Sequence, residues 1–514
     1  MTNVKYSALR IKNMASLSCD RSCGDSEQSH VSSKKLKIHF IYPDISTGVT
    51  HQLNLGLASI SAVLKKNQHE VALTHLTKEP SKKDILKEIS QKSPDFIGFS
   101  STTNQFHYVE LISKWIKEEF PKIPIVVGGV HATLAPDNVI QDKNIDFVCI
   151  GEGEYPLLEL LEKGANNPEI QNIWSKGRKN PIRPLIDNLD SLPFPDYDLF
   201  DITSLLKEID GELPLLAGRG CPYPCTYCSN HAIRKIYSGK GEYVRYKSVD
   251  YLLEEIEHYK SKYKFSKLAF CDDTFTLNRK WIKDFSQKYP ARFSFPYNCN
   301  ARVENVTPDL IKDLKSSGCE MMSFGIESGS EWLRKEILKK GTFSNQKIEE
   351  AFRLVNDSGI RTFSYNMIGL PFETPKMIQE TIDLNKKIKP SYIVVFIYYP
   401  YPSTELYEIC KENGWLTRDS TNSYLEAKSL LNMSTITHKQ ILQFYDKFNK
   451  VSMESYVRTD YPTLMPLFRG MCFLIGGTRT RKLLANLKYN NVIRPIYNSF
   501  LKRDPEQFGK EIQR

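Results

Sequence analysis

The feature that most constrains this chain is an alternation of short β-branched runs with helical stretches over residues 35–155. The runs "KLKIHFIYP", "HEVALTHL", "DFIGFSS", "PIVVGGV" and "DFVCIGEGE" are typical of strands. Between them, stretches such as "LGLASISAVLKKNQ" and "YVELISKWIKEEF" carry apolar residues at helical spacing. Strands joined by helices form a parallel sheet covered on both faces. We therefore expect a doubly wound, Rossmann-like α/β domain at the N-terminal end.

A second alternating series begins near residue 213. Its six strand candidates are "LPLLAGR", "KLAFCDD", "FSFPYNCNAR", "EMMSFGIES", "RTFSYNMIGL" and "YIVVFIYYP". Several of the helical stretches between them start with Ser, Thr or Pro and end near Gly, as helix caps and stops require. Six strand–helix units predict a partial (β/α)6 TIM-like barrel, in which chemistry takes place at the carboxyl ends of the strands.

Composition divides the 514 residues into five expected parts. Residues 1–34 are polar and Ser-rich, which predicts a flexible extension, and 35–176 form the first α/β domain. Residues 177–212 are rich in Pro, Asp and Asn and predict an extended linker. The barrel is expected at 213–411, and 412–514 is expected to be helical and basic. Residues 465–514 contain ten Lys/Arg and three Asp/Glu.

The sequence shows no run of about eighteen apolar residues and no compact apolar signal peptide. Its eleven cysteines are scattered and do not form a disulfide framework. These features predict a protein of the reducing cytoplasm.

Cys221, Cys225 and Cys228 lie together in "LLAGRGCPYPCTYCSN", directly after the first strand of the second series. A structural zinc site needs four ligands, and His231 follows Cys228 too closely to complete one. We expect the cysteines near the later strands, Cys271, Cys299 and Cys319, to be small buried residues. We assign no role to Cys19 and Cys23 in the N-terminal extension.

Three thiolates suit a four-iron cluster, because they leave one iron open to a small molecule. Pro222 and Pro224 fix the backbone of the loop around such a cluster, and Tyr227 supplies an aromatic wall. The C-x-x-x-C-x-x-C spacing after a first barrel strand resembles the radical S-adenosylmethionine enzymes. That resemblance implies a 4Fe–4S cluster held by the three cysteines, which cleaves S-adenosylmethionine to a 5′-deoxyadenosyl radical.

Further motifs of residues 213–408 resemble the same family, and they imply a site for S-adenosylmethionine. "CDDTF" follows the second strand, so Asp272 or Asp273 is implied for the methionine amino group; the alternative is a helix N-cap. "GIESGS" implies Glu327 for the ribose, and "NMIGLPFET" implies Gly369 near the adenosyl group, with Tyr227 beside them. "YPYPSTELYE" departs from the family's P-x-P-G-T-x-L-Y, because Ser403 replaces Gly.

The first domain resembles that of cobalamin-binding radical enzymes. "GFSSTTN" and "VVGGVHAT" match the segments that contact the nucleotide tail of cobalamin, and "CIGEGE" matches a further segment. The residues implied for cobalamin are Ser100, Ser101, Thr102, Gly128 and Gly129. The D-x-H-x-x-G motif that supplies a cobalt-ligating histidine in many cobalamin proteins does not occur, and we expect His131 to be a loop residue.

The combined resemblance implies a cobalamin-dependent radical enzyme that methylates an unactivated carbon or phosphorus centre with methylcobalamin. Ring formation or rearrangement with the same cofactors is an alternative. A second alternative is a non-catalytic cobalamin-binding sensor, although the intact cysteine triplet, Glu327 and the paired aspartates argue against it. Zinc-dependent nucleic-acid binding lacks its ligand set, so no nucleic-acid partner is expected.

The expected partners are a small-molecule or lipid substrate and a reduced ferredoxin or flavodoxin as electron donor. The basic C-terminal region suits an interfacial helix at the inner face of a membrane. Its alternative is a helical cap on the barrel with a solvated charged face.

Overall fold

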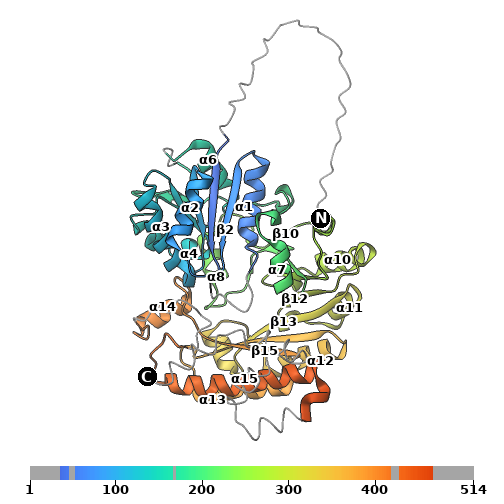
Figure 1. Cartoon of the computed structure of the whole chain (residues 1–514). Coiled ribbons are helices and arrows are strands. Elements are labelled where there is room, and N and C mark those ends of the chain that lie inside the picture. The colour runs from blue at the N-terminus through green and yellow to red at the C-terminus, as the bar shows by residue number, and fades with distance from the viewer. Residues whose placement is uncertain (1–34, 46–51, 166–168, 418–427, 467–514) are drawn as a thin grey trace, which may run out of the picture. The chain divides into compact units, whose positions relative to one another are not determined.

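A computed structural model of the chain describes residues 35–45, 52–165, 169–417 and 428–466 (Figure 1). The predicted extension 1–34 and most of the basic tail lie outside the described residues. The description below concerns the described ranges only.

The N-terminal domain is built on a parallel sheet in the strand order β2-β1-β3-β4-β5. Strand β1 lies between β2 and β3, as a doubly wound fold requires, because the chain reverses its direction of travel across the sheet there. The strands are β1 (Lys37–Pro43), β2 (Glu70–Leu76), β3 (Phe96–Ser100), β4 (Ile125–Gly128) and β5 (Phe147–Cys149).

Helices cover both faces of this sheet. Helices α1 (Leu55–Lys66) and α6 (Glu154–Lys163) bury their apolar side chains in one core cluster, whereas α2 (Lys82–Lys92) and α3 (Phe106–Glu119) bury theirs in another. Figure 1 shows α1 on one side of the sheet and α2 and α3 on the other. The predicted α/β class is confirmed.

Two short antiparallel strands extend the sheet beyond β5. They are β6 (Ile173–Ser175) and β7 (Arg178–Lys179). Strand β7 and helix α7 (Ile202–Glu208) both fall within the segment 177–212, which the sequence predicts to be an extended linker. The segment is therefore only partly extended. Strand β7 completes a hairpin, two short 3-10 turns lie at Leu189–Ser191 and Tyr197–Leu199, and Ile202, Leu205 and Leu206 of α7 are buried.

The second sheet has six parallel strands in the order β15-β14-β13-β12-β11-β8. These are β8 (Glu212–Leu215), β11 (Lys267–Phe270), β12 (Tyr297–Ala301), β13 (Cys319–Glu327), β14 (Arg361–Ile368) and β15 (Tyr392–Ile397). Each strand pairs with the next in chain order, which is the topology of a barrel that has not closed. The predicted partial barrel is confirmed.

Helices α9 (Val249–Lys262), α10 (Arg279–Arg292), α11 (Pro308–Ser316), α12 (Asn345–Asp357) and α13 (Pro375–Ile388) connect these strands. Each begins at a side chain that accepts a hydrogen bond from a backbone N–H of the first turn: Ser248, Asn278, Thr307, Ser344 and Thr374. The helix starts are therefore fixed by local chemistry, and the strand ends face the same edge.

The described C-terminal part is helical, with α14 (Glu405–Glu412) and α15 (His438–Asp460). Helix α15 runs along α13 and edge strand β15 (Figure 1). Its Ile441, Tyr445 and Phe448 are buried in the same core cluster as Ile393 and Ile397 of β15. Among the described residues, no helix combines the length and the apolar character that crossing a membrane requires.

Replacing Phe448 by alanine tests how firmly α15 is part of the barrel. The ring is fully buried, so its loss should lower the free energy of unfolding by about 3–5 kcal/mol, measured by urea denaturation. Gln443→Ala, on the exposed face of the same helix, should change that free energy by less than about 0.5 kcal/mol. Equal stabilities for both variants would contradict this packing.

Candidate active site

The three clustered cysteines lie where the first barrel strand ends. Strand β8 leads into a short strand, β9 (Gly218–Arg219), and the loop that carries Cys221, Cys225 and Cys228 then runs into helix α8 (Ser229–Ile236). Cys225 is buried, whereas the other two are half-buried, and all three are free thiols. The loop therefore sits at the carboxyl end of a barrel strand, where the sequence predicted it.

Backbone contacts brace the loop against the segment after β13. Thr226 donates its N–H to the Leu338 carbonyl at 3.0 Å and its hydroxyl to the Ile337 carbonyl at 2.7 Å. The Leu406 N–H in turn donates to the Thr226 carbonyl at 3.0 Å. Thr226 lies between two of the cysteines, so these bonds fix the thiols relative to the barrel.

Burial favours the protonated form of two of the three thiols. Burial, helped by the nearby Cys225, Asp273 and Cys221, raises the pKa of Cys228 to about 12. Burial also raises the pKa of Cys221. Such thiols ionise when a cation replaces the proton. Within the described ranges, no group of three or more His, Cys, Asp or Glu residues is arranged to hold a single metal ion. A four-iron cluster does not require such an arrangement, because each thiolate binds a different iron.

Two cations that the sequence prediction missed lie beside the loop. Arg302, directly after β12, points a guanidinium N–H at Cys225 Sγ, 3.6 Å away, and also donates to the Lys340 carbonyl. Lys340 donates to Glu327 at 2.9 Å. Burial lowers the pKa of Lys340, but Glu327 and Cys225 raise it more, so the net pKa is above its ordinary value. A positive charge thus faces the thiol that is most buried.

Tyr227 and Glu327, both predicted to contact S-adenosylmethionine, lie together. The Tyr227 hydroxyl donates to Glu327 Oε1 at 3.1 Å, and Lys340 Nζ lies 3.2 Å from the same hydroxyl. Glu327 ends β13 with a left-handed φ of 65°. That conformation costs about 1–3 kcal/mol for a residue with a side chain, and the bonds to Lys340 and Tyr227 hold the side chain in this position.

The structure separates the roles of Asp272 and Asp273. Both carboxylate oxygens of Asp272 accept backbone N–H groups, from Ala217 at 2.9 Å and Gly218 at 2.6 Å. Burial raises the pKa of Asp272 to about 7. Asp272 therefore braces the strand end, whereas Asp273 is exposed beside it in a cavity that also contains Gly220 and Tyr246. The geometry favours Asp273 over Asp272 as a ligand for an amino group.

Gly369 forms a tight turn at the end of β14. It is buried with φ of 73°, and a side chain there would meet Ile441 of α15 at 3.2 Å. Its N–H donates to Glu373 Oε2 at 2.6 Å. Burial raises the pKa of Glu373 to about 8. Helix α15 packs against this turn, and the approach of Gly369 to an adenosyl group stays a prediction.

A large cavity lies at the carboxyl edge of the N-terminal sheet. Its volume is about 1480 Å³, including its open mouth. All five residues predicted to contact cobalamin line it: Ser100, Ser101, Thr102, Gly128 and Gly129. The sequence prediction missed the aromatic part of the lining, which comes from Phe40, Tyr42, Phe99, Tyr237 and Tyr243.

The polar end of this cavity fits a large ligand that carries hydrogen-bonding groups. Ser101 is 2 % exposed, and its hydroxyl has no hydrogen-bond partner among the described residues. Gly129 has φ of 91°, and a side chain there would come within 2.8 Å of the Ser101 backbone. This glycine keeps the Ser101 loop in place, so the cavity offers an unused hydroxyl where a ligand tail would pass.

His131 is not the loop residue that the sequence predicted. It lies in a short helix, α4 (Gly129–Leu134), because the chain turns into a helix directly after the two glycines. Its Nδ1 is 3.2 Å from the Thr103 hydroxyl, and its ring packs against Phe106 at an interplanar angle of 36°. Burial lowers the pKa of His131. His131 does not line the cavity and has a structural role.

Arg219 joins the cavity to the cysteine loop. This residue, two before Cys221, donates to Glu152 at 2.9 Å and to Glu154 at 2.6 Å. Arg245, in strand β10 (Arg245–Tyr246), also donates to Glu152 at 2.9 Å. The two carboxylates belong to the "CIGEGE" segment. This segment matches the cobalamin-binding radical enzymes in sequence, but no role was predicted for Glu152 or Glu154. They bind the barrel to the first domain.

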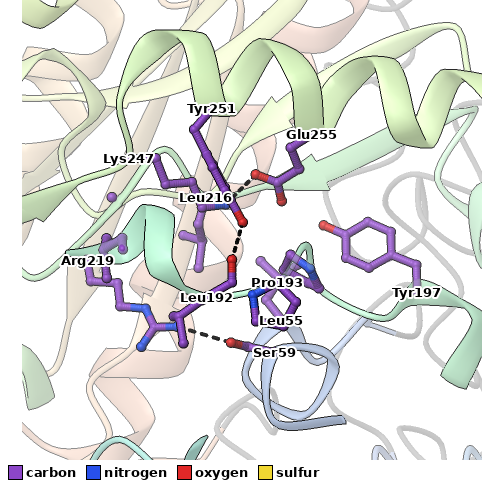
Figure 2. A pocket seen from close by; sticks show the side chains of 13 residues that line it. Leu55, Ser59, Leu192, Pro193, Tyr197, Leu216, Arg219, Lys247, Tyr251 and Glu255 are labelled. Carbon is purple, nitrogen blue, oxygen red and sulfur yellow. Dashed lines mark hydrogen bonds and ion pairs between the residues drawn. The ribbon is translucent and has the colours of Figure 1, made fainter. Parts of the chain in front are cut away.

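A second, smaller pocket marks the same joint. Figure 2 shows Arg219 reaching Ser59 of α1, with Leu192 and Tyr251 close by. The Arg219–Ser59 distance is 3.2 Å, and Lys247 pairs with Glu255 at 2.5 Å. Leucine and proline side chains fill much of its lining and no cysteine reaches it, so it is part of the domain joint.

Comparison with known proteins follows the two-part architecture. Residues 46–161 match the B12 binding domain family, and residues 215–384 match the radical SAM superfamily. These ranges contain the large cavity's sheet edge and the cysteine loop, respectively.

Two curated relatives cover most of this chain. It is 28 % identical to an uncharacterized methyltransferase of Pyrococcus horikoshii, over 80 % of this chain and 92 % of that protein. It is 24 % identical to the anaerobic magnesium-protoporphyrin IX monomethyl ester cyclase of Rubrivivax gelatinosus, over 73 % of this chain and 70 % of that protein.

Among solved structures, the fold is similar to that of the radical S-adenosylmethionine methyltransferase TsrM from Kitasatospora setae. The TM-score is 0.61 at 16 % identity, covering 75 % of this chain and 78 % of that chain. A B12 binding domain and a radical SAM barrel that carries a three-cysteine loop occur here in one chain. The chain belongs to the cobalamin-binding radical S-adenosylmethionine enzymes.

Proposed function

We propose that this enzyme is a methyltransferase that transfers a methyl group to an unactivated carbon or phosphorus centre of a small molecule. When bound, the 4Fe–4S cluster and S-adenosylmethionine supply a hydrogen-abstracting radical, and cobalamin carries the methyl group. The similarity to the methyltransferases of Pyrococcus and Kitasatospora supports this choice of reaction.

The observation that carries the proposal is that one cavity contacts both cofactor regions. Ser101 and Gly129 of the first domain line the same cavity as Arg219 and Gly220, and Gly220 immediately precedes Cys221. A substrate held at this wall would be within reach of a methyl carrier on one side and of the radical source on the other. Proximity of this kind is the main contribution that a protein makes to cofactor chemistry.

We assign roles to the chain's own residues accordingly. Cys221, Cys225 and Cys228 hold the cluster, and Arg302 places a positive charge against Cys225. Asp273 binds the amino group of S-adenosylmethionine, and Glu327, held by Lys340 and Tyr227, accepts hydrogen bonds from the ribose. The roles of Ser100, Ser101 and Thr102 are hydrogen bonds to cobalamin, and Gly128 and Gly129 let its tail pass.

Ring formation or rearrangement remains the second candidate, because a cyclase of Rubrivivax is also a relative. The two reactions differ in products. Methyl transfer converts one S-adenosylmethionine to S-adenosylhomocysteine for each one cleaved to 5′-deoxyadenosine, whereas cyclisation needs only the cleavage. Both products should therefore accumulate in anaerobic turnover, and 5′-deoxyadenosine alone would favour the cyclase reaction.

We propose the cytoplasm as the compartment and a reduced ferredoxin or flavodoxin as the electron donor. The support for a reducing compartment is that the eight described cysteines are all free thiols. The membrane contact suggested by the basic tail concerns residues 467–514, which lie outside the described residues, and it stays a prediction.

Removing the three cysteines together separates the two cofactors. Wild-type protein purified without oxygen and reconstituted with hydroxocobalamin should contain about four iron atoms and about one cobalt atom per chain. The Cys221→Ala, Cys225→Ala, Cys228→Ala variant should lose the iron and keep the cobalt, measured by elemental analysis and optical spectra. Its retained cobalt is the internal evidence that the variant has folded.

Two results would contradict the proposal. Iron without cobalt in the wild type would remove cobalamin and leave a radical enzyme of another kind. Cobalt without iron would identify a non-catalytic cobalamin-binding sensor.

Gly129→Ala tests the cobalamin cavity. The new methyl group would strain the left-handed backbone and press on the Ser101 loop, so the affinity for cobalamin should fall about tenfold for a cost of roughly 1–2 kcal/mol. Optical titration with hydroxocobalamin measures it. Gly164→Ala is the matched control, because Gly164 has a similar φ of 77° but no atom within 4 Å of the added carbon. Equal affinities in the two variants would remove Gly129 from the cobalamin site.

A further inference from the structure

A groove with five cationic side chains opens against the cysteine loop. Its volume is about 1050 Å³, open to solvent. The charged residues that line it, which we call the cationic groove, are Arg302, Lys335, Lys339, Lys340, Lys347 and Glu304. It shares no lining residue with the cobalamin cavity. Only Arg302 and Lys340 also have a role at the cluster loop, so the proposed reaction leaves Lys335, Lys339 and Lys347 without a function.

The groove reaches the cluster ligands through one layer of side chains. Tyr223 and Pro224, which lie between Cys221 and Cys225 in the chain, form part of its wall. The Arg302 guanidinium lies 3.7 Å from the Tyr223 ring centre and 3.6 Å from Cys225 Sγ. A molecule seated in the groove would therefore lie one side chain away from Cys225.

The charge of the groove is accessible from solvent. The exposed fraction of the side chain is 59 % for Lys335, 49 % for Lys339 and 35 % for Lys347. Residues 331–347 contain five Lys/Arg and two Glu, a net charge of +3. The ion pairs of these lysines, such as Lys335 with Glu336 at 3.0 Å, are surface pairs that cost little to exchange for another carboxylate.

An exposed tryptophan lies three residues before Lys335 in the chain. Trp332 is 47 % exposed, the largest fraction among the exposed large apolar side chains of the described residues. It immediately precedes the short π-helix Leu333–Ile337, which carries Lys335. Exposed tryptophan side chains are enriched at protein interfaces.

We propose that the cationic groove docks the acidic face of a small electron-carrier protein. One electron passes from the reduced carrier, which is oxidised by one electron, to the oxidised cluster, and no bond is made or broken. Opposite charges favour such an encounter and raise its rate at low ionic strength. This inference rests on the proposed function, because it requires a cluster at Cys221, Cys225 and Cys228.

The test compares two variants of equal net charge. The groove variant is Lys335→Glu, Lys339→Gln, Lys347→Glu; glutamine at 339 avoids opposing Glu405, and glutamate at 347 suits the N3 position after Ser344. The control variant is Lys83→Glu, Lys87→Glu, Lys122→Gln, three exposed lysines of the first domain. Each variant changes the charge by the same amount.

The measurement is the rate at which a reduced bacterial flavodoxin transfers electrons to the reconstituted enzyme, followed by stopped-flow absorbance at low ionic strength. The groove variant should react about tenfold more slowly than wild type and show a weaker salt dependence. The control variant should react as wild type does. Reduction by dithionite, which needs no docking, should be alike in all three proteins and shows that each is folded and loaded.

Each other result has a definite meaning. Equal flavodoxin rates in the groove and control variants, with normal dithionite reduction, would overturn the docking surface and leave the proposed function standing. A wild-type protein that takes up no iron, or whose cluster dithionite cannot reduce, would overturn the proposed function and the docking surface with it.

Discussion

The contact on which the rest of the arrangement depends is the ion-pair network of Arg219. This side chain leaves the barrel two residues before Cys221 and bonds Glu152 and Glu154 of the first domain. Glu154 is buried and Arg219 is partly buried, so removing Arg219 should cost less than the roughly 3–5 kcal/mol typical of a fully buried pair. The network therefore sets the distance between a cluster held by the cysteines and a cofactor in the large cavity. That distance determines whether the cluster and the cofactor can act on one substrate.

The fold class and the two cofactor regions could be predicted from the sequence, because the patterns that indicate them lie within short segments of the chain. The two series of alternating strands and helices gave the fold class, and the spacing of the cysteines with Ser101, Gly128 and Gly129 indicated both cofactor regions. The charges that join those regions could not be predicted. Glu152 contacts Arg219 and Arg245 across 67 and 93 residues of sequence. The hydrophobic periodicity of a sequence predicts local helices and strands but not contacts between residues so far apart.

The same limit applies to residues around the cluster loop. Arg302 and Lys340 lie after different strands and meet only because parallel strands end at one edge of the barrel. The sequence could not choose between Asp272 and Asp273 either, because only the backbone N–H groups of Ala217 and Gly218 show that Asp272 is already engaged. His131 was misjudged for a related reason, because the chain turns into helix α4 directly after Gly128.

The most direct test of a shared site is the magnetic interaction between the reduced cluster and cob(II)alamin. Both are paramagnetic, so electron paramagnetic resonance of the doubly reduced holoenzyme detects whether they are close. We predict that the cob(II)alamin signal broadens and relaxes faster when the cluster is reduced, and that the triple-cysteine variant lacks this change. A cob(II)alamin signal that stays the same with an oxidised and a reduced cluster would contradict the claim that one cavity contacts both cofactors.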